Sequence, residues 1–253
     1  MEVHTHTHTD DPDIHRGKKK FTHYLWEFLM LFLAVFCGFL AENFREHQVE
    51  RQREKQYMRS MVKDLASDLI NINLDIENRM SKHQMADSLT EMFLNNDVAA
   101  KTSYIYFCAR RFSIVGYIFH MTDGTLMQLK NSGGLRLIRE QDVVDSLQGY
   151  YNLFQQYLDN RELEMFELRD YRDLMVRVFD VKVFDAMIKN FPLTIIPPGN
   201  PPLLNNDHLL VNELLMRVHL CKRINLVNIQ QLVELKDRGL RLIQQIREEY
   251  HLQ

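Results

Sequence analysis

The segment FTHYLWEFLMLFLAVFCGFLA, residues 21–41, decides the architecture of the chain. Its only strongly polar members are His23 and Glu27, and a tyrosine and a tryptophan stand near one end. An α-helix rises about 1.5 Å per residue, so the segment is roughly 30 Å long, which is the thickness of a bilayer core. Aromatic rings with a polar edge favour the level of the lipid headgroups. We therefore predict a transmembrane helix over residues 21–43.

Two other interpretations of this segment were weighed against a membrane span. The apolar run from Phe28 to Ala41 alone would fit a buried core helix. A cleaved signal peptide fits less well, because the apolar region is too long and no small-x-small cleavage site follows it. The lysine cluster at Lys18–Lys20 favours an uncleaved anchor with a cytoplasmic N-terminus, although basic residues also follow the other end. We expect a bacterial inner-membrane anchor with the C-terminal domain in the periplasm.

One face of the predicted membrane helix carries small residues together with its only carboxylate. At 100° per residue Glu27, Ala34, Gly38 and Ala41 fall close to one line, and most phenylalanines point elsewhere. Small residues four apart let helix backbones approach closely in lipid, so this face predicts self-association. Two interpretations of Glu27 stay open. It either snorkels to the headgroups and pairs with a lysine, or several copies meet in an oligomer and bind a proton or cation.

Composition indicates helix and excludes several classes of protein. Only 9 Gly and 6 Pro occur in 253 residues, fewer than a β-sandwich or barrel needs for its turns. The net charge of −3 gives no field that would attract nucleic acid. Three widely spaced cysteines make neither a disulfide framework nor a metal knuckle. The sequence therefore predicts an all-α protein: a single N-terminal transmembrane helix that continues into a long stalk helix, followed by an α-helical bundle.

The stalk is expected over residues 44–94. Residues 45–56 are polar on nearly all sides, which suits a solvated helix that lifts the rest of the chain roughly 18 Å from the membrane. Apolar residues then recur at alternating spacings of four and three, a heptad seam formed by Met58, Val62, Leu65, Leu69, Ile72 and Ile76. This seam fits either a coiled coil with another chain or an amphipathic helix that packs against its own domain.

Residues 95–253 are predicted to form the helical bundle. Asn95–Asp97 indicates a turn. Thr122 and Asp123 are typical of the cap of a short helix over residues 124–130, and Gly133–Gly134 ends that helix. Five of the six prolines fall between residues 192 and 206, which indicates a surface loop. Asp207 then begins a final helix that runs towards Tyr250. Long helices joined by short connections are typical of bundles.

Two blocks of the sequence are similar to a known family. The first is Tyr24-x-x-Glu27 with the apolar run, followed by Ala41-x-Asn43-x-x-Glu46 and YMRSMVKDLASD at residues 57–68. The second is TLMQLKNSGGLRLI at residues 125–138. Together they resemble an uncharacterised family of single-span membrane proteins from diderm bacteria with a helical C-terminal region. The resemblance covers roughly residues 20–160, and the His-rich N-terminus departs from it. It implies the architecture and no activity.

The N-terminal tail offers a candidate metal site. His4, His6 and His8 alternate with threonine within residues 1–20, which we expect to be disordered. Closely spaced imidazoles bind Zn²⁺, Ni²⁺ or Cu²⁺, but a disordered tail must be ordered to do so and supplies nothing to orient the rings. We therefore expect incidental affinity for metal and no cofactor.

Four basic residues are candidate contacts for a partner or an anion. Arg110 and Arg111 lie between aromatic residues and would suit an anionic lipid headgroup, an acidic partner or the charged face of a hairpin. Lys130 and Arg136 flank Ser132 and two glycines, where a serine nucleophile would lack a positioned base. A helix that is ended by glycine explains that block more simply.

The sequence contains no Gly-rich phosphate loop, His-Glu-x-x-His motif or paired-cysteine motif. We therefore expect a membrane-anchored protein that is not an enzyme: a homo-oligomeric scaffold or sensor that binds the bilayer and an unknown envelope protein. The alternative is an oligomeric subunit for ion or proton transport, or for energy coupling, that uses Glu27.

Overall fold

The computed structural model describes residues 16–95, 98–114, 116–188 and 194–252, with side chains from residue 21 onwards. Within these ranges the chain is all-α, as predicted, and an isolated bridge between Ile188 and Thr194 is the only β-type pairing. It divides into two compact units, residues 1–54 and residues 55–253. The first helix, α1 (Arg16–Leu94), contributes residues to both units.

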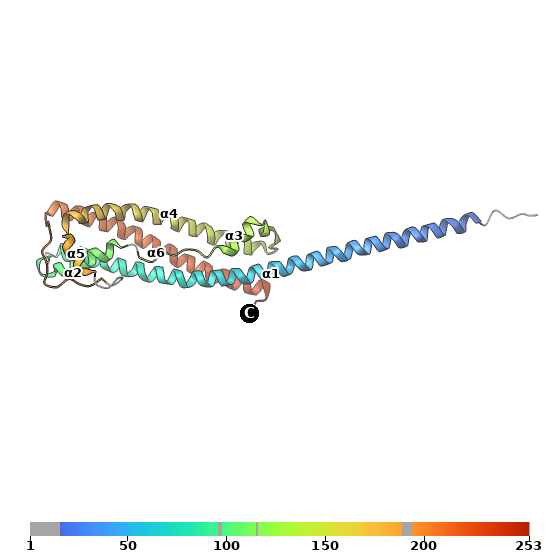
Figure 1. Ribbon diagram of the computed structural model, residues 1–253, viewed down its shortest axis with the longest axis horizontal. Coiled ribbons are helices and arrows are strands. Elements are labelled where there is room, and N and C mark those ends of the chain that lie inside the picture. The colour runs from blue at the N-terminus through green and yellow to red at the C-terminus, as the bar shows by residue number, and fades with distance from the viewer. Residues whose placement is uncertain (1–15, 96–97, 115, 189–193, 253) are drawn as a thin grey trace, which may run out of the picture. The chain divides into compact units, whose positions relative to one another are not determined.

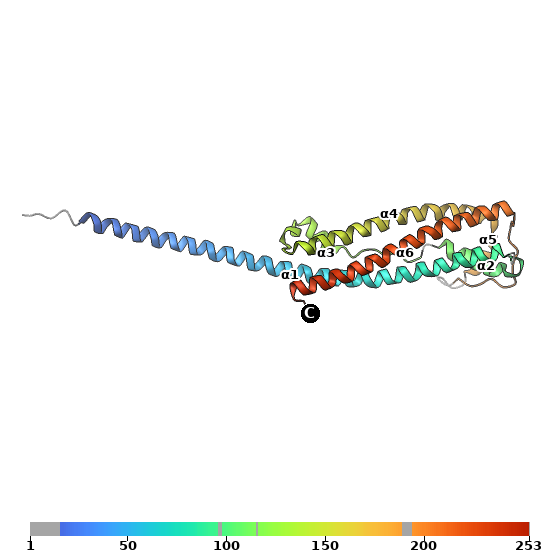
Figure 2. The ribbon, with the colours of Figure 1, turned by 180° about the vertical axis from the view of Figure 1, so that it is seen from behind.

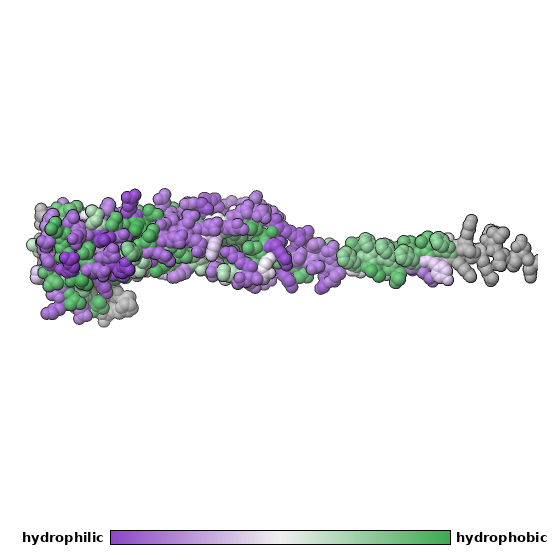
Figure 3. All heavy atoms as spheres, turned by 90° about the horizontal axis from the view of Figure 1, so that it is seen from above, coloured by the Kyte–Doolittle hydropathy of each residue, from purple (hydrophilic) through white to green (hydrophobic). Residues whose placement is uncertain are grey.

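Unit 1 consists, where it is described, of the first part of α1. All of the side chains from Phe21 to Ala41 are exposed. Figure 3 shows this part of α1 as a hydrophobic surface, with hydrophilic residues on the section that follows. This apolar helix has the length and composition of a membrane span. A core helix of a soluble domain would be covered by other elements, whereas these side chains are bare. The structure thus contains the long apolar N-terminal helix that the sequence predicts.

Unit 2 is built on three long helices: the second part of α1, α4 (Gln141–Val178) and α6 (His208–Tyr250). They run side by side in both ribbon views (Figures 1 and 2). The shorter elements are α2 (Val98–Ser113), α3 (Gly124–Asn131), the 3₁₀ helix η1 (Gly134–Leu137) and α5 (Val181–Met187). The predicted helical bundle is therefore present.

The buried residues of all three long helices follow a heptad pattern, with alternating steps of three and four. In α4 the pattern runs through Val143, Leu147, Tyr150, Phe154, Tyr157, Arg161, Glu164, Leu168, Tyr171, Met175 and Val178. In α6 it runs through Val218, Cys221, Asn225, Asn228, Leu232, Leu235, Gly239, Leu242 and Ile246. In α1 it runs through Met58, Met61, Leu65, Asp68, Ile72, Asp75 and Arg79. One continuous seam on each helix faces the other two.

The core is divided into two apolar clusters. One contains Ile72 of α1, Tyr157 of α4 and Leu232 of α6. The other begins at Ala86 on α1 and extends over the opposite end of the unit, with the aromatic side chains of α2. Between the two clusters, each long helix contributes polar or charged residues, which are buried except for the half-buried Lys82. We call this set the polar layer; it consists of Asp75, Arg79, Lys82, Arg161, Glu164, Asn225 and Asn228.

The predicted stalk seam packs within unit 2. Three of its residues are buried in the first cluster and three are half-buried against it, namely Met58, Leu65 and Ile72, and Val62, Leu69 and Ile76. The compact unit begins at Lys55, so it includes residues 55–94 of the predicted stalk as well as the predicted bundle, residues 95–253. Of the two interpretations of the seam, the structure favours packing against the chain's own domain.

Local capping agrees with the sequence prediction at two helix boundaries and differs from it at a third. Asp207 precedes α6, and its carboxylate accepts hydrogen bonds from the N–H groups of Leu209 and Leu210, both at 3.0 Å. Gly133 follows α3 with a φ of 66°, in the left-handed region that glycine adopts without strain. Asp123 precedes α3, but its side chain makes no capping bond.

Candidate functional site

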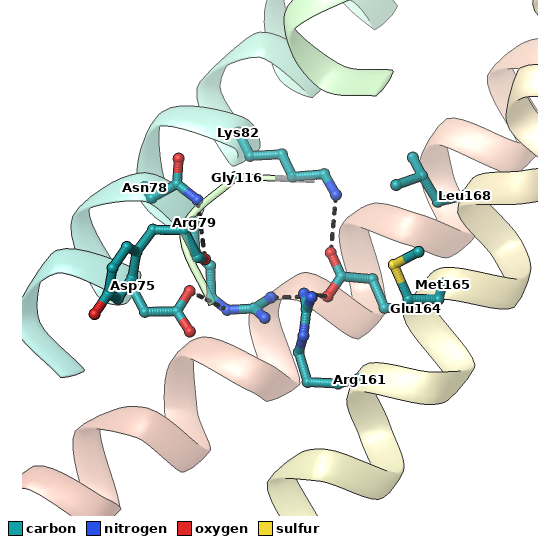
Figure 4. A pocket seen from close by; sticks show the side chains of 10 residues that line it. Asp75, Asn78, Arg79, Lys82, Gly116, Arg161, Glu164, Met165 and Leu168 are labelled. Carbon is teal, nitrogen blue, oxygen red and sulfur yellow. Dashed lines mark hydrogen bonds and ion pairs between the residues drawn. The ribbon is translucent and has the colours of Figure 1, made fainter. Parts of the chain in front are cut away.

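Arg79 is the centre of the polar layer. Its side chain is 2% exposed and comes from α1, between the two apolar clusters. Nη1 donates to Glu164 of α4 at 2.9 Å and to the Asn225 side-chain oxygen of α6 at 3.1 Å. Nε forms an ion pair with Asp75 Oδ1 at 3.0 Å, without the alignment of a good hydrogen bond. Figure 4 shows the ion pairs of Arg79 with Asp75 and Glu164. Together with the bond to Asn225, they bring one guanidinium into contact with all three long helices.

Glu164 receives more donors than any other carboxylate described in unit 2. Its Oε2 atom accepts from Arg79 at 2.9 Å, Arg161 at 2.8 Å and Asn228 at 3.0 Å. Its Oε1 atom accepts from Lys82 Nζ at 2.8 Å. Burial by itself raises the pKa of Glu164, but the charges of Lys82, Arg79 and Arg161 outweigh burial and hold that pKa at about 2. The carboxylate is therefore ionised throughout the physiological pH range.

Two tyrosines of α4 meet two aspartates of α1 at matching seven-residue spacings. Tyr157 donates its hydroxyl proton to Asp75 at 2.5 Å and also accepts from Arg79 at 3.2 Å. Tyr150 donates to Asp68 at 3.2 Å. Burial, followed by the neighbouring carboxylates, raises the pKa of both tyrosines, although Arg79 opposes the shift at Tyr157. Each hydroxyl is thus held as a donor, and the register between α1 and α4 is fixed at two successive levels.

The same aspartates also bind the backbone of the segment 116–123, which carries no regular secondary structure. Three carboxylates from one face of α1 accept N–H groups of this segment and of the first turn of α3. The bonds run from Phe119 N to Asp75 Oδ2 (2.9 Å), from Thr122 N to Asp68 Oδ1 (2.7 Å) and from Thr125 N to Asp64 Oδ2 (3.2 Å). Buried backbone N–H groups need partners, and here helix side chains take the place of a β-sheet neighbour.

Gly116 marks the closest approach of this segment to α1. A Cβ atom on Gly116 would lie 1.9 Å from Asn78 Nδ2, so a larger residue would displace that side chain. Asn78 Nδ2 in turn lies 3.4 Å from the Tyr117 carbonyl oxygen. Space beside Asn78, rather than its backbone angles, thus favours glycine at this position.

Burial raises the pKa of Asp68, against the hydrogen bonds from the Thr122 backbone and the Tyr150 hydroxyl that lower it. Asp68 and Glu164 therefore shift in opposite directions. Glu164 has three cations within contact distance, whereas Asp68 has neutral donors only among the bonds described here. Neutral donors compensate less of the cost of burying a charge.

The polar layer borders a cavity of about 10 Å³, which is lined by Asp75, Arg79, Lys82, Gly116, Arg161 and Glu164, among others (Figure 4). That volume is about the size of one water molecule. The described charges around it are engaged with one another, so the arrangement is suited to fixing the register of three helices. Among the described residues, no group of three or more His, Cys, Asp or Glu side chains could hold a metal ion.

The predicted membrane-face residues Glu27, Ala34, Gly38 and Ala41 are exposed on α1 in unit 1. The Glu27 carboxylate lies 3.1 Å from His23 Nε2, one helical turn away. Both interpretations of Glu27 therefore stay predictions.

The four basic candidates are not brought together. Arg110 and Arg111 belong to α2, whereas Lys130 and Arg136 belong to α3 and η1, at the opposite end of unit 2 (Figures 1 and 2). Lys130 Nζ lies 3.6 Å above the centre of the Tyr151 ring, which is a cation–π contact. Arg110 lines a pocket beside α5. The tail residues His4, His6 and His8 lie outside the described residues.

The sequence analysis missed the members of the polar layer. Its seam followed apolar residues and so passed through Leu69 and Ile76, where the buried positions are Asp68 and Asp75. A signal was available: Tyr150, Tyr157 and Glu164 repeat every seven residues on α4. Polar residues at heptad core positions indicate a buried network that sets register.

Comparison of the chain with models of known protein families gives no match, and comparisons with curated proteins and with solved structures give none either. The family resemblance in residues 20–160 therefore stays a prediction.

Tyr157→Phe removes a hydroxyl that joins Asp75 to Arg79 while it keeps the ring in place. We expect the free energy of unfolding to fall by about 1–3 kcal/mol, because a buried carboxylate loses a donor. The measurement is urea unfolding of the full chain in a nonionic detergent, followed by circular dichroism. The control is Tyr151→Phe on the same helix, which is half-buried and should change stability by less than about 0.5 kcal/mol. Equal effects of the two substitutions would contradict the assigned role.

Glu164→Gln should change the acid dependence of stability. The pKa of Glu164 is about 2 in the folded chain. Because a free glutamate titrates near 4.3, the carboxylate stabilises the fold fully above that pH and loses its contribution between about pH 4.5 and pH 2. Urea unfolding of the wild type should therefore weaken over that window. Glu164→Gln should show a shallower decline and a stability at pH 7 that is lower by about 3–5 kcal/mol, because three buried cations lose their counter-charge.

Asp68 titrates in both proteins, so the difference between them isolates Glu164. Glu162→Gln, an exposed change on the same helix, serves as the control and should keep the wild-type profile. Parallel pH profiles of the wild type and Glu164→Gln would show that folding does not lower the pKa of Glu164.

Proposed function

We propose that this protein is a membrane-anchored, non-catalytic helical scaffold or sensor of the bacterial cell envelope, whose folded unit binds another envelope component. The observation that carries the proposal is the exposed apolar section of α1, residues 21–41, in a chain that also folds a separate compact unit. Seventeen exposed apolar side chains would be costly in water, and a bilayer is the solvent that suits them.

The interior of unit 2 supports a structural role for its charges. The strongest acceptor, Glu164, is saturated by four donors, and the cavity beside it has room for about one water molecule. A catalytic carboxylate generally faces space in which a substrate can bind. These charges instead join three helices, as a rigid scaffold or a signal-transmitting bundle requires.

The surface of α6 supports a protein partner. Leu226, Val233 and Leu240 are spaced seven residues apart, and each is between 43% and 49% exposed. They lie beside the buried seam and form a second apolar stripe, which we call the outer stripe. A heptad stripe suits an additional helix, from a second copy of the chain or from a different envelope protein.

The orientation is proposed from the basic residues. A lysine cluster immediately before the apolar segment suits a cytoplasmic N-terminus in the inner membrane, which places unit 2 in the periplasm. This prediction is tested in a diderm bacterium with a tag after Gln253. The tag should be digested by protease once the outer membrane is opened, and should resist digestion in intact cells. Digestion of the tag only after the inner membrane is lysed would show the opposite orientation, with unit 2 in the cytoplasm.

The partner surface is tested by photo-cross-linking in the same cells. A photoreactive amino acid at Val233, in the middle of the outer stripe, should give one discrete cross-linked species. The same group at Arg241, which is exposed and lies about 80° around α6 from Val233, serves as the control and should give little of that species. Mass spectrometry then identifies the species as a second copy or as another protein. Equal adducts from both positions, or none from Val233, would contradict the proposed surface.

A further inference from the structure

A pocket of about 480 Å³ lies where α2, α4 and α5 meet, and it belongs entirely to unit 2. The helices α2 and α5 lie at the same end of the bundle in both ribbon views (Figures 1 and 2). Its volume falls within the roughly 300–1,000 Å³ that sites for small ligands occupy. Most of its wall is apolar and is formed by Met175, Val176, Phe179, Val181, Phe184 and Leu204.

The apolar wall is partly open to water. Met175 and Phe179 form its buried floor, with exposures of 7% and 3%. Val176, Val181 and Leu204 stand at the rim and are 72%, 74% and 61% exposed. A cluster of bare aliphatic side chains around a buried apolar floor is a surface that a hydrocarbon chain would cover favourably.

Two arginines supply the polar part of the pocket. Arg172 of α4 donates from Nε and Nη2 to the Ser113 carbonyl oxygen, at 3.0 and 2.6 Å, which fixes its guanidinium at the end of α2. Arg110 of α2 lies one turn before Ser113, and its Nε atom is buried without a hydrogen-bond partner. In the part of the chain that the structure describes, neither arginine forms an ion pair with an acid.

The charges around the pocket favour an anion. Besides the two arginines, Asp180 is the acid that lines it, and one of its oxygens accepts the Lys182 backbone N–H at 2.9 Å. Two cations and one anion leave an excess of one positive charge beside an apolar wall. A ligand with a single negative charge and a hydrocarbon chain complements both parts, because arginine binds carboxylate with paired N–H donors.

We propose that this pocket binds a free monoacyl anion, with the carboxylate at Arg110 and Arg172 and the acyl chain over Val176, Phe179, Val181 and Leu204. This site is separate from the outer stripe on α6. It does not depend on which envelope component the protein binds or on the orientation of the anchor.

The test uses the full chain in lipid nanodiscs and a dodecanoate analogue with a diazirine at the end of its chain. After photolysis, mass spectrometry of peptides maps the labelled residues. Label in the peptides that carry residues 175–184 and 204 is the expected result. Label within residues 21–41, which any lipid-soluble probe should give, is the internal reference for the amount of probe present.

Val176→Asp places a negative charge at an exposed rim position, so it tests charge without disturbing the core. We expect label in the pocket, relative to residues 21–41, to fall by about fivefold or more, which corresponds to roughly 1 kcal/mol of repulsion. The matched control Val176→Asn is polar but neutral and should keep most of the label. Arg110→Gln should lower the label as Val176→Asp does.

A probe with the same chain and diazirine but a trimethylammonium headgroup completes the design. It should label the wild-type pocket weakly and gain label in Val176→Asp. Equal labelling of the pocket by the two probes would show an unselective apolar surface and overturn the proposal. So would label confined to residues 21–41, or dodecanoate labelling that is unaffected by Val176→Asp.

Discussion

The buried guanidinium of Arg79 must have charged and polar partners, and the three long helices of unit 2 supply them. Arg79 is almost fully covered and its pKa is raised, because the nearby charges of Glu164 and Asp75 outweigh the effect of burial. A buried cation without such partners would cost several kcal/mol. Glu164 comes from α4 and Asn225 from α6, so the charge is compensated only when all three helices are at one relative height. Apolar heptads alone would tolerate a shift of one helix by a whole repeat, and the polar layer does not.

The aspartates of α1 extend that constraint to a part of the chain that forms neither helix nor sheet. Asp75 takes part in the polar layer through Arg79 and Tyr157, and it also accepts the Phe119 backbone N–H. Asp68 repeats the arrangement one heptad earlier with Tyr150 and Thr122. The extended segment is therefore positioned by the same carboxylates that align the helices. Its place in the fold follows from the bundle register rather than from any pairing of its own.

The sequence predicted the elements far better than it predicted the polar layer. Some features depend only on residues that are close in the chain, so a single sequence is enough to predict them. They are the apolar run of residues 21–41, the Asp207 cap and the glycines after α3. The capping of α3 was predicted for Asp123, but the carboxylate that binds its first turn is Asp64, about sixty residues earlier in the chain. Such a contact depends on how the helices pack against one another, and the spacing of apolar residues along one helix does not predict that packing.

The polar residues of the seam were hard to assign for a related reason. A carboxylate at a heptad core position can mark the edge of a helix or the middle of a buried network, and only the partner distinguishes the two. The burial of Asp75 is compensated by Arg79, Tyr157 and Phe119, which come from three separate stretches of the chain. The pocket beside α5 had the same difficulty, since Arg110 and Arg172 are distant in sequence and line one pocket only after Arg172 binds the Ser113 carbonyl at the end of α2.

The position of the polar layer between two apolar clusters limits how the lengths of the helices can change. A one-residue insertion in α4 between Tyr157 and Glu164 would rotate everything beyond it by about 100° and turn Glu164 away from Arg79. Seven inserted residues would restore the face but displace it by roughly 10 Å along the axis, so that compensating insertions would be needed in α1 and α6. Growth or shrinkage of this bundle is therefore confined to concerted changes in three separate stretches of the chain, or to the ends that lie outside the layer.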